Sequence, residues 1–588
     1  IQEEATTAAL ILRHCLETPG RSACLVTPDR QLARRVKAEL RRWNIDIGDS
    51  AGEPLIRFGG AALLSLLLDA ILEDFAAEPL AALLRHELAG FGLPLAEARR
   101  QTGLIELAML RSGTGAPAIG NLAHAMRLAA FPPDRKPAHM LLRNVSAEQW
   151  EEAIAHCARI SEILAPLRAP SSADTLAAHL DRLVQGCEAI AGDGFWRAEG
   201  GEILAEAVAL LRGESRLLRR CDLRRAAAII RHWLRALPVR GQAHEPLPIR
   251  ILGLLEARLM RADVMVLAGL NEGVWPGAAD CGPWLNRPMR EALDMRQPEA
   301  QIGQTAHDFI QAFGNPEVKL LWSRRVGDAP ATPSRWILRL LMILKSADCH
   351  DAKRESPWTD LARRLDAPAA VNPMPKPRPR PSRDLRPRAL SVTRIETLIR
   401  DPYAIYARHV LQLEPVKPVS AMPDAARRGI IIHGAIGDFL SAYPADLPAD
   451  IRAELERFGK QHFKQIADYP GLVSFWWPRF LRAADWFAAA EPEFRAGVER
   501  VLSEESGAID LPVAGENFRL SCRADRIDLM ADGTARITDY KTGKEPSNTQ
   551  VEKGLAPQLT LQAAILRNGG FGTDRTRPVL SLIHISEP

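Results

Sequence analysis

Two runs of alternating apolar and polar residues near the end of the chain, joined by Asp532-Gly533, constrain the fold most. An Asp-Gly pair between two such runs is typical of the turn of a β-hairpin. The sequence therefore predicts Asp525 on one strand and Asp539 on its neighbour. Because Asp539 and Lys541 are two residues apart, a strand directs both to one face and Tyr540 to the other. Two carboxylates and one ammonium group are thus expected to converge.

This group of charges suits a divalent metal ion. Carboxylate oxygens are hard ligands, and Mg²⁺ binds one or two carboxylates while it keeps several waters. A metal-bound water beside a lysine is able to attack a phosphodiester. The alternative is a surface hairpin with solvated charges, since patterns of three residues recur by chance.

Two apolar helices are predicted around this hairpin in the sequence. The first starts at Gly429-Ile430-Ile431-Ile432-His433-Gly434, and the second begins at Gln558. A helix with His, then Asp, Asp-x-Lys and a helix with Gln is an order that resembles the PD-(D/E)xK nuclease fold of the RecB type. In that family these positions form the metal and catalytic site. The resemblance implies metal ligands at His433, Asp525 and Asp539, and catalytic roles for Asp525, Asp539, Lys541 and Gln558.

The last helix departs from the family pattern. The family often has Gln-x-x-x-Tyr there, but Gln562 stands in place of the tyrosine, so only Gln558 is carried over. The resemblance further implies that Lys541 positions or polarises the attacking water and that His433 completes or orients the site. Asp528 stays open between a residue that supports the site and a simple surface charge.

Four positions are predicted to contact nucleic acid. Arg523 and Arg526 flank Asp525 closely and carry the charge that a phosphate backbone attracts. Thr27 and Arg324 stand at the ends of two predicted strands, where open α/β sheets place their ligands.

In the first half of the chain the predicted secondary structure changes from strand and helix to helix alone, and then back to strands. Residues 23–27 are predicted as a short buried strand and 28–43 as a helix. From about 60 to 240 the pattern is helical, with apolar stripes that we interpret as core. Strand patterns return in three segments, at 249–254, 264–270 and 318–322.

Four motifs of this region resemble the AddB family, whose members join AddA in bacterial double-strand-break processing. They are Val26-Thr27-Pro28-Asp29-Arg30, Gly253-Leu254-Leu255-Glu256-Ala257-Arg258, Gly269-Leu270-Asn271-Glu272-Gly273-Val274-Trp275-Pro276 and Pro333-Ser334-Arg335-Trp336. The resemblance implies an α/β fold: a RecA-like helicase domain with a large helical insertion, then a PD-(D/E)xK nuclease domain, truncated at both ends. The expected segments are a first RecA-like part (1–60), the insertion (61–244), a second RecA-like part (245–345), a linker (346–389), an incomplete nuclease domain (390–580) and a probable non-native tail (581–588).

The resemblance also bears on cofactors. No G-x-x-x-x-G-K-[ST] motif occurs, and the first motor domain is expected upstream of Ile1, so ATP binding stays open. Gln301-Ile302-Gly303 stands where helicases usually have an arginine-rich motif, which indicates a weak motor at most. Many AddB relatives hold an iron–sulfur cluster through a Cys at the position of Asp401, and clusters need thiolates. We therefore expect Mg²⁺ and no iron–sulfur cluster.

Two segments keep alternative interpretations. The linker holds many prolines and six basic residues between Lys376 and Arg388, so it is either a solvated tether or a strap that tracks phosphates. An aromatic-rich segment from Phe475 to Phe487 either stacks bases or forms the core of a helix, which its spacing of three to four residues favours.

Bulk composition sets weaker limits. A net charge of +4 over 588 residues gives no argument for nucleic acid, which has to come from local patches. The eight cysteines form no C-x-x-C pair, so neither a zinc site nor a disulfide framework is predicted, and a reducing cytoplasm fits best. No apolar run is long enough to span a bilayer, so no membrane is expected as a partner.

The sequence thus predicts a Mg²⁺-dependent DNA exonuclease on a helicase-like scaffold, acting on DNA ends in double-strand break repair with an AddA-type partner subunit. Two alternatives stay open: a DNA-binding scaffold whose nuclease is inactive, and a free-standing RecB-like nuclease. The first lacks support because all four core residue types are present. The second does not explain the motifs at Asn271 and Pro333.

Overall fold

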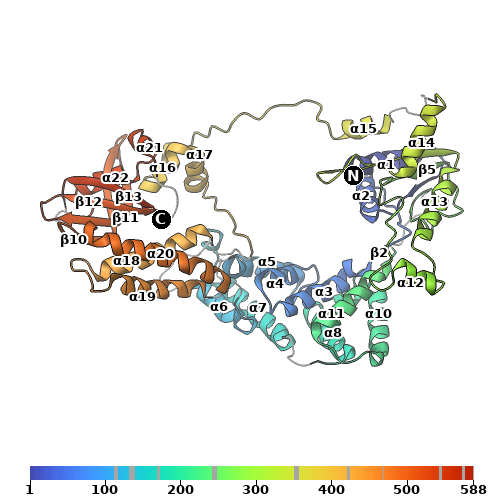
Figure 1. Cartoon of the computed structure of the whole chain (residues 1–588), viewed down its shortest axis with the longest axis horizontal. Coiled ribbons are helices and arrows are strands. Elements are labelled where there is room, and N and C mark those ends of the chain that lie inside the picture. The colour runs from blue at the N-terminus through green and yellow to red at the C-terminus, as the bar shows by residue number, and fades with distance from the viewer. Residues whose placement is uncertain are drawn as a thin grey trace. The chain divides into compact units, whose positions relative to one another are not determined.

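In the computed structural model the chain forms two compact units, each with a sheet of its own (Figure 1). The first unit contains Ile1–Asp74, His86–Leu95 and Pro166–Met374, and the second contains Phe75–Arg85, Ala96–Ala165 and Pro375–Pro588. The structure describes residues 1–111, 117–131, 140–168, 173–240, 248–349, 357–419, 424–467, 469–541, 546–572 and 576–586.

The first unit is built around a parallel sheet with the strand order β4-β1-β5-β6. Its strands are β1 (Ala23–Val26), β4 (Ile249–Leu252), β5 (Val264–Leu267) and β6 (Glu317–Leu320). Val264 and Val266 of β5 pack in one core, and Met265 and Leu267 pack in the other. Burial on both faces explains why the central strands are continuous apolar runs without alternation.

Helices cover both faces of this sheet. One core is shared with α1 (Gln2–Cys15) and α2 (Arg30–Leu40), and the other with α13 (Glu299–Phe313) and α14 (Arg335–Ser346). The α/β class predicted for this part is confirmed, but four strands by themselves do not identify a RecA-like domain. The unit also contains α12 (Arg287–Ala292), α15 (Pro357–Leu365) and a two-stranded sheet of β7 (Arg325–Val326) and β8 (Ala329–Pro330).

A helical segment leaves the first sheet and returns to it. Its ends are brought together by β2 (Glu53–Pro54), which pairs with β3 (Pro238–Val239) in an antiparallel ladder. The first unit holds α3 (Gly59–Leu72), α8 (Leu176–Ala191), α9 (Gly194–Arg197), α10 (Gly201–Glu214) and α11 (Leu223–Ala236). The second unit holds α4 (Ala77–Leu84), α5 (Leu95–Ile105), α6 (Leu122–Ala130) and α7 (Ala147–Leu164). Leu95, the first residue of α5, belongs to the first unit. Helices therefore occupy the segment where periodicity predicts them, divided between the two units.

The sheet of the second unit has the strand order β10-β11-β12-β13, with β9 beside β11. β11 runs antiparallel to both β10 and β12, whereas β12 and β13 run parallel. The strands are β9 (Ala389–Ser391), β10 (Val498–Val513), β11 (Glu516–Met530), β12 (Ala535–Lys541) and β13 (Val579–Ser586). The segment predicted as a tail, 581–588, thus contributes backbone to β13 as far as Ser586, and residues 587–588 lie outside the described residues.

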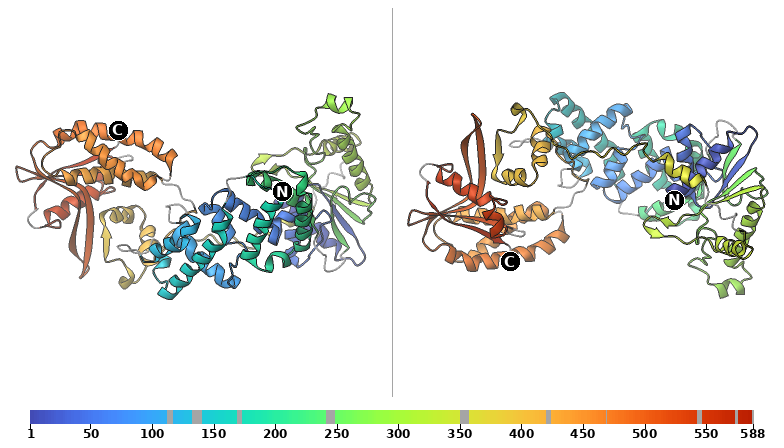
Figure 2. Two further views of the ribbon diagram at one scale, coloured as in Figure 1. Left: turned by 90° about the horizontal axis from the view of Figure 1, so that it is seen from below. Right: turned by 90° about the horizontal axis from the view of Figure 1, so that it is seen from above.

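Two helical layers cover this second sheet (Figure 1 and Figure 2). One consists of α18 (Ala425–Ala442), α19 (Ile451–Phe463) and α20 (Pro470–Phe494), and the other of α16 (Val392–Arg400) and α22 (Gln558–Arg567). Short helices α17 (Pro402–Ile405) and α21 (Asn548–Glu552) complete the unit. Trp476, Phe480 and Phe487 of α20 are buried among the helices, so the core interpretation of the aromatic segment is confirmed for these three.

The linker is irregular over most of its length. Residues 371–382 form neither helix nor strand, and residues 371–380 are exposed. A proline-rich solvated tether is expected to look like this. Its proposed contact with phosphates stays a prediction.

Candidate active site

The hairpin predicted around Asp532-Gly533 is present, so that prediction is confirmed. β11 and β12 pair from Arg526 opposite Thr538 to Leu529 opposite Ala535. Gly533 has a positive φ of 85°, a conformation that glycine adopts without steric cost. The hairpin places Asp525 and Asp539 on adjacent strands, as the sequence predicted.

Asp539, Lys541 and Gln558 are in direct contact. Lys541 Nζ lies 2.8 Å from Asp539 Oδ2 and donates a hydrogen bond of 3.0 Å to Gln558 Oε1. Gln558 Nε2 donates to Asp539 Oδ1 over 2.6 Å. Since Gln558 is the first residue of α22, this helix fixes the amide over the end of β12.

Asp525 lies at the centre of a second set of contacts. Its Oδ2 accepts a hydrogen bond of 2.9 Å from the backbone N–H of Tyr540 and lies 3.5 Å from His433 Nδ1. Burial raises the pKa of Asp525 to about 6, and the nearby negative charge of Asp539 acts in the same direction. A carboxyl group with a raised pKa beside another carboxylate is typical of functional sites.

Glu504 on β10 is a residue that the sequence analysis missed. It has a positive φ of 54° within the strand, and its side chain packs on α18, where a Cβ at Gly437 would lie 3.0 Å from Glu504 Cγ. His433, Glu504 and Asp525 each offer a ligand atom, and these atoms all lie within 4.8 Å of one another. The only sequence signal was the acidic pair Glu504-Glu505, and alternation alone does not tell which member faces Asp525.

This donor set fits a divalent cation. Two carboxylates and one imidazole are within reach of a common centre, whereas Asp539 is not in that group of three. Asp539 Oδ2 is buried, and Lys541 Nζ is its charged neighbour at 2.8 Å among the residues that the structure describes. The predicted ligand set of His433, Asp525 and Asp539 is therefore joined by Glu504, with Asp539 close enough to perturb Asp525 electrostatically.

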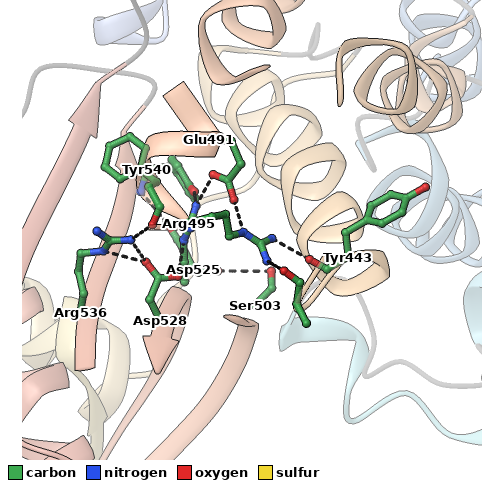
Figure 3. A network of polar contacts seen from close by, with 11 residues as sticks. Tyr443, Glu491, Arg495, Ser503, Asp525, Asp528, Arg536 and Tyr540 are labelled. Carbon is green, nitrogen blue, oxygen red and sulfur yellow. Dashed lines mark hydrogen bonds and ion pairs between the residues drawn. The ribbon is translucent and has the colours of Figure 1, made fainter. Parts of the chain in front are cut away.

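Arg526 does not have the exposure that a contact with DNA requires. Its side chain is 1% exposed and pairs with Glu491 and Asp528, both at 2.6 Å. The placement argues against the predicted contact with a nucleic-acid backbone, because the guanidinium points into the protein. Asp528 is fully buried between Arg526 and Arg536, so it is an internal ion-pair partner and not a surface charge (Figure 3).

The other predicted nucleic-acid positions differ in exposure. Arg523 is 67% exposed and lies 2.8 Å from Glu504, at the edge of the site. Thr27 is completely buried, and its hydroxyl accepts from the N–H of Asp29, which argues against a contact with DNA. Arg324 is exposed in the first unit.

The AddB-like motifs of the first unit contact one another. Arg335 forms an ion pair with Glu272, and Asn271 Nδ2 donates to the carbonyls of Ser323 and Thr332. Arg258 Nε and Nη2 donate to the two carboxylate oxygens of Asp308, over 2.8 and 3.1 Å. The Arg335–Glu272 pair thus joins two motifs that are distant in sequence, whereas Ser323, Thr332 and Asp308 lie outside the four motifs.

Comparison with known proteins supports the class of the second unit. Residues 389–586 match the PD-(D/E)XK nuclease superfamily. The mixed α/β fold therefore contains a domain in its C-terminal part that matches the PD-(D/E)XK nuclease superfamily. The nuclease fold predicted from the order of His433, Asp525, Asp539 and Gln558 is confirmed at this level.

Relatives that match more of the chain carry no functional description. An uncharacterized protein of Rickettsia bellii is 25% identical over 320 residues, 54% of this chain and 38% of that protein. An uncharacterized protein of Rickettsia conorii is 26% identical over 392 residues, 64% of this chain and 44% of that protein. The chain spans less than half the length of these curated relatives.

A weaker similarity points to AddB-like proteins. The B subunit of an ATP-dependent helicase/deoxyribonuclease from Streptococcus equi subsp. zooepidemicus is 28% identical over 193 residues, 32% of this chain and 17% of that protein. Among the described residues no helix has both the length and the apolar composition to cross a membrane. Asp401, at the position expected for a cluster thiolate, accepts a hydrogen bond from the N–H of Ala404 and so caps α17.

Proposed function

We propose that this protein is a Mg²⁺-dependent DNA nuclease that works as an AddB-type subunit in the resection of DNA ends. The observation that carries the proposal is the cluster of His433, Glu504 and Asp525 beside the Asp539–Lys541–Gln558 triad, within a PD-(D/E)XK nuclease domain. Clustered carboxylates with one imidazole and one ammonium group match the needs of metal-assisted phosphodiester hydrolysis.

Asp525, Glu504 and His433 would hold the metal ion, and Asp539 would join them when its ion pair with Lys541 loosens. The ion supplies a water of lowered pKa and a positive charge for the scissile phosphate. Oxygen ligands favour Mg²⁺, which binds few protein carboxylates. Among the described residues the neighbour that Asp539 Oδ2 would give up is Lys541 Nζ, at 2.8 Å.

Lys541 is the group that acts on the reacting atoms. Its Nζ is held between Asp539 Oδ2 and Gln558 Oε1, which leaves a third N–H to hydrogen bond an attacking water or a phosphate oxygen. Gln558 orients this ammonium group through its carbonyl while its amide N–H₂ holds Asp539. A lysine oriented in this way stabilises negative charge that develops during hydrolysis.

The wider role rests on the first unit and on the similarity to the streptococcal helicase/deoxyribonuclease. We propose that the doubly covered parallel sheet is a RecA-like scaffold with a helical insertion, and that an AddA-type subunit is the partner in double-strand break repair. We propose the same segments as the sequence indicated: 1–60, 61–244, 245–345, 346–389, 390–580 and 581–588. Six of the eight cysteines are buried thiols, which supports a reducing compartment such as the cytoplasm.

The proposal is tested by incubating the purified protein with linear duplex DNA, with and without an AddA-type partner, in Mg²⁺ or in EDTA. We expect cleavage that requires Mg²⁺ and disappears in Asp539→Ala. DNA binding without cleavage under every condition would favour the inactive scaffold. Full cleavage that no AddA-type partner changes would favour a free-standing nuclease.

A further inference from the structure

Glu491 near the end of α20 is a carboxylate buried between two arginines. Its side chain is 1% exposed, Oε2 accepts a hydrogen bond of 2.6 Å from Arg526 Nη1, and Oε1 accepts one of 2.7 Å from Arg495 Nε (Figure 3). Burial of charged groups is costly unless they are paired and hydrogen bonded. Both carboxylate oxygens of Glu491 are used in this way.

Each arginine carries the network to a different part of the domain. Arg495 Nη2 donates to the carbonyl of Tyr443 over 2.7 Å, directly after the end of α18, the helix that carries His433. Arg526 lies on β11 next to Asp525, and its Nη1 also donates to the hydroxyl of Tyr540 over 3.2 Å. Glu491 therefore connects the helix of one proposed metal ligand to the strand of another.

Tyr540 contacts Arg526 through its side chain and Asp525 through its backbone. Its hydroxyl accepts from Arg526, and its backbone N–H donates to Asp525 Oδ2 over 2.9 Å. Tyr540 also lies between Asp539 and Lys541 in sequence. Because strand residues alternate, its side chain points away from these two neighbours and into the core shared with α18 and α20. The network thus lies on the side of the sheet covered by α18, where the His433 and Tyr540 ring centroids are 6.4 Å apart, and on the opposite face from Lys541.

A second contact ties the same elements together from β10. Ser503 Oγ lies 3.3 Å from the carbonyl of Gly437 on α18 and 3.4 Å from the carbonyl of Asp525 (Figure 3). Ser503 directly precedes Glu504, the third proposed ligand. Polar contacts therefore join α18, β10 and β11, the three elements that carry the proposed ligands. Among the contacts described in this subsection, the one from the N–H of Tyr540 to Asp525 Oδ2 uses a ligand's own carboxylate.

We propose that Glu491 is a positioning residue for the metal site. Its two ion pairs hold the α18 helix, and with it His433, at the correct distance from Asp525. Glu491 does not touch the reacting atoms and acts only through Arg526 and Arg495. This inference rests on the proposed function, because it needs a metal ion to bind at His433, Glu504 and Asp525.

The test measures Mn²⁺ affinity by isothermal titration calorimetry in the whole protein, together with circular dichroism. In Glu491→Gln we expect Mn²⁺ affinity to fall about 10- to 100-fold, the effect of removing groups that orient metal ligands. Tyr540→Phe removes one hydrogen bond and no charge, so we expect a loss of about fivefold. The matched control is Asp485→Asn on the same helix, whose carboxylate is 63% exposed and pairs with Arg452; its Mn²⁺ affinity stays at the wild-type value.

The outcomes separate this inference from the function on which it rests. If the wild-type protein binds no Mn²⁺, or if Asp525→Asn binds it unchanged, the metal site itself is refuted. If the wild type binds Mn²⁺ and folded Glu491→Gln binds it equally well, the positioning role of Glu491 is refuted while the site stands. Should Glu491→Gln fail to fold, Tyr540→Phe decides: an unchanged affinity in this folded variant overturns the inference.

Discussion

Gln558 Nε2 donates a hydrogen bond of 2.6 Å to Asp539 Oδ1, so the amide at the start of α22 cannot rotate freely. The opposite end of the same amide, Oε1, then faces Lys541 Nζ at 3.0 Å. One side chain therefore orients both members of the Asp-x-Lys pair. The order of contacts assigns the amide nitrogen to the carboxylate and the amide oxygen to the ammonium group, which is the only arrangement in which both are satisfied.

We expect Gln558→Ala to slow cleavage by about 10- to 100-fold, because Lys541 loses the acceptor that orients it. The measurement is kcat on linear duplex DNA in Mg²⁺. Gln461→Ala, an exposed glutamine on α19, serves as a control that keeps the wild-type rate. A Gln558→Ala variant as fast as this control would exclude the orienting role.

Lys541→Met separates metal binding from catalysis. The change removes the ammonium group and frees Asp539 Oδ2 from its ion pair of 2.8 Å. We therefore expect Mn²⁺ affinity to stay equal or to increase, while cleavage falls by at least about a hundredfold. A parallel loss of affinity and cleavage would instead make Lys541 a residue that supports the fold of the site.

Asp539→Ala is expected to abolish Mg²⁺-dependent cleavage and to leave DNA binding largely intact, since Asp539 is 3% exposed and offers little surface to DNA. Binding is measured by fluorescence anisotropy with a labelled duplex in EDTA. Cleavage retained within a few-fold would contradict the assignment of Asp539 to the site.

The hairpin and its charges were predictable because the signals are local. The Asp532-Gly533 turn sets the pairing of β11 with β12, and alternation then puts Asp539 and Lys541 on one face. The place of Gln558 followed from its position at the start of an apolar helix. The proximity of Asp539, Lys541 and Gln558 could therefore be predicted from local patterns and the order of the elements alone.

Glu504 and Arg526 could not be placed in this way. Strict alternation would put Ala524, Arg526 and Asp528 on one face, but Ala524 packs in the core that also contains Ile527, while Arg526 is buried in the polar network. The strand therefore changes face near Asp525, opposite the positive φ of 54° at Glu504. Such irregularities depend on tertiary packing, and a repeat of two residues does not reveal them.

Glu504→Gln tests the residue that the sequence did not indicate. The variant keeps the size of the side chain and removes one of the two carboxylates within 4.8 Å of His433. We expect weaker Mn²⁺ binding and slower cleavage at low Mg²⁺, with partial recovery at high Mg²⁺. The neighbouring Glu505→Gln is the matched control, and equal behaviour of the two variants would remove Glu504 from the site.

The last prediction concerns pH. Burial and the charge of Asp539 raise the pKa of Asp525 to about 6 in the folded protein, against 3.8 as the reference value of the unfolded chain. Between these two values the folded state binds more protons than the unfolded state, so the contribution of Asp525 to stability is lost as the pH rises from about 4 to about 6. Asp525→Asn cannot ionise and lacks this loss.

In EDTA we therefore expect Asp525→Asn to become more stable than the wild type as the pH rises through this window, by on the order of 3 kcal/mol above pH 6 to 7. The free energy of unfolding is measured with urea from pH 4 to pH 8, with Asp485→Asn as the control for a carboxylate that is 63% exposed. Mg²⁺ should reverse the order at pH 7.5, because only the wild type offers an ionised ligand at position 525. A difference between the two proteins that stays constant from pH 4 to pH 8 would show that Asp525 is not the buried, destabilised carboxylate that a metal ion compensates.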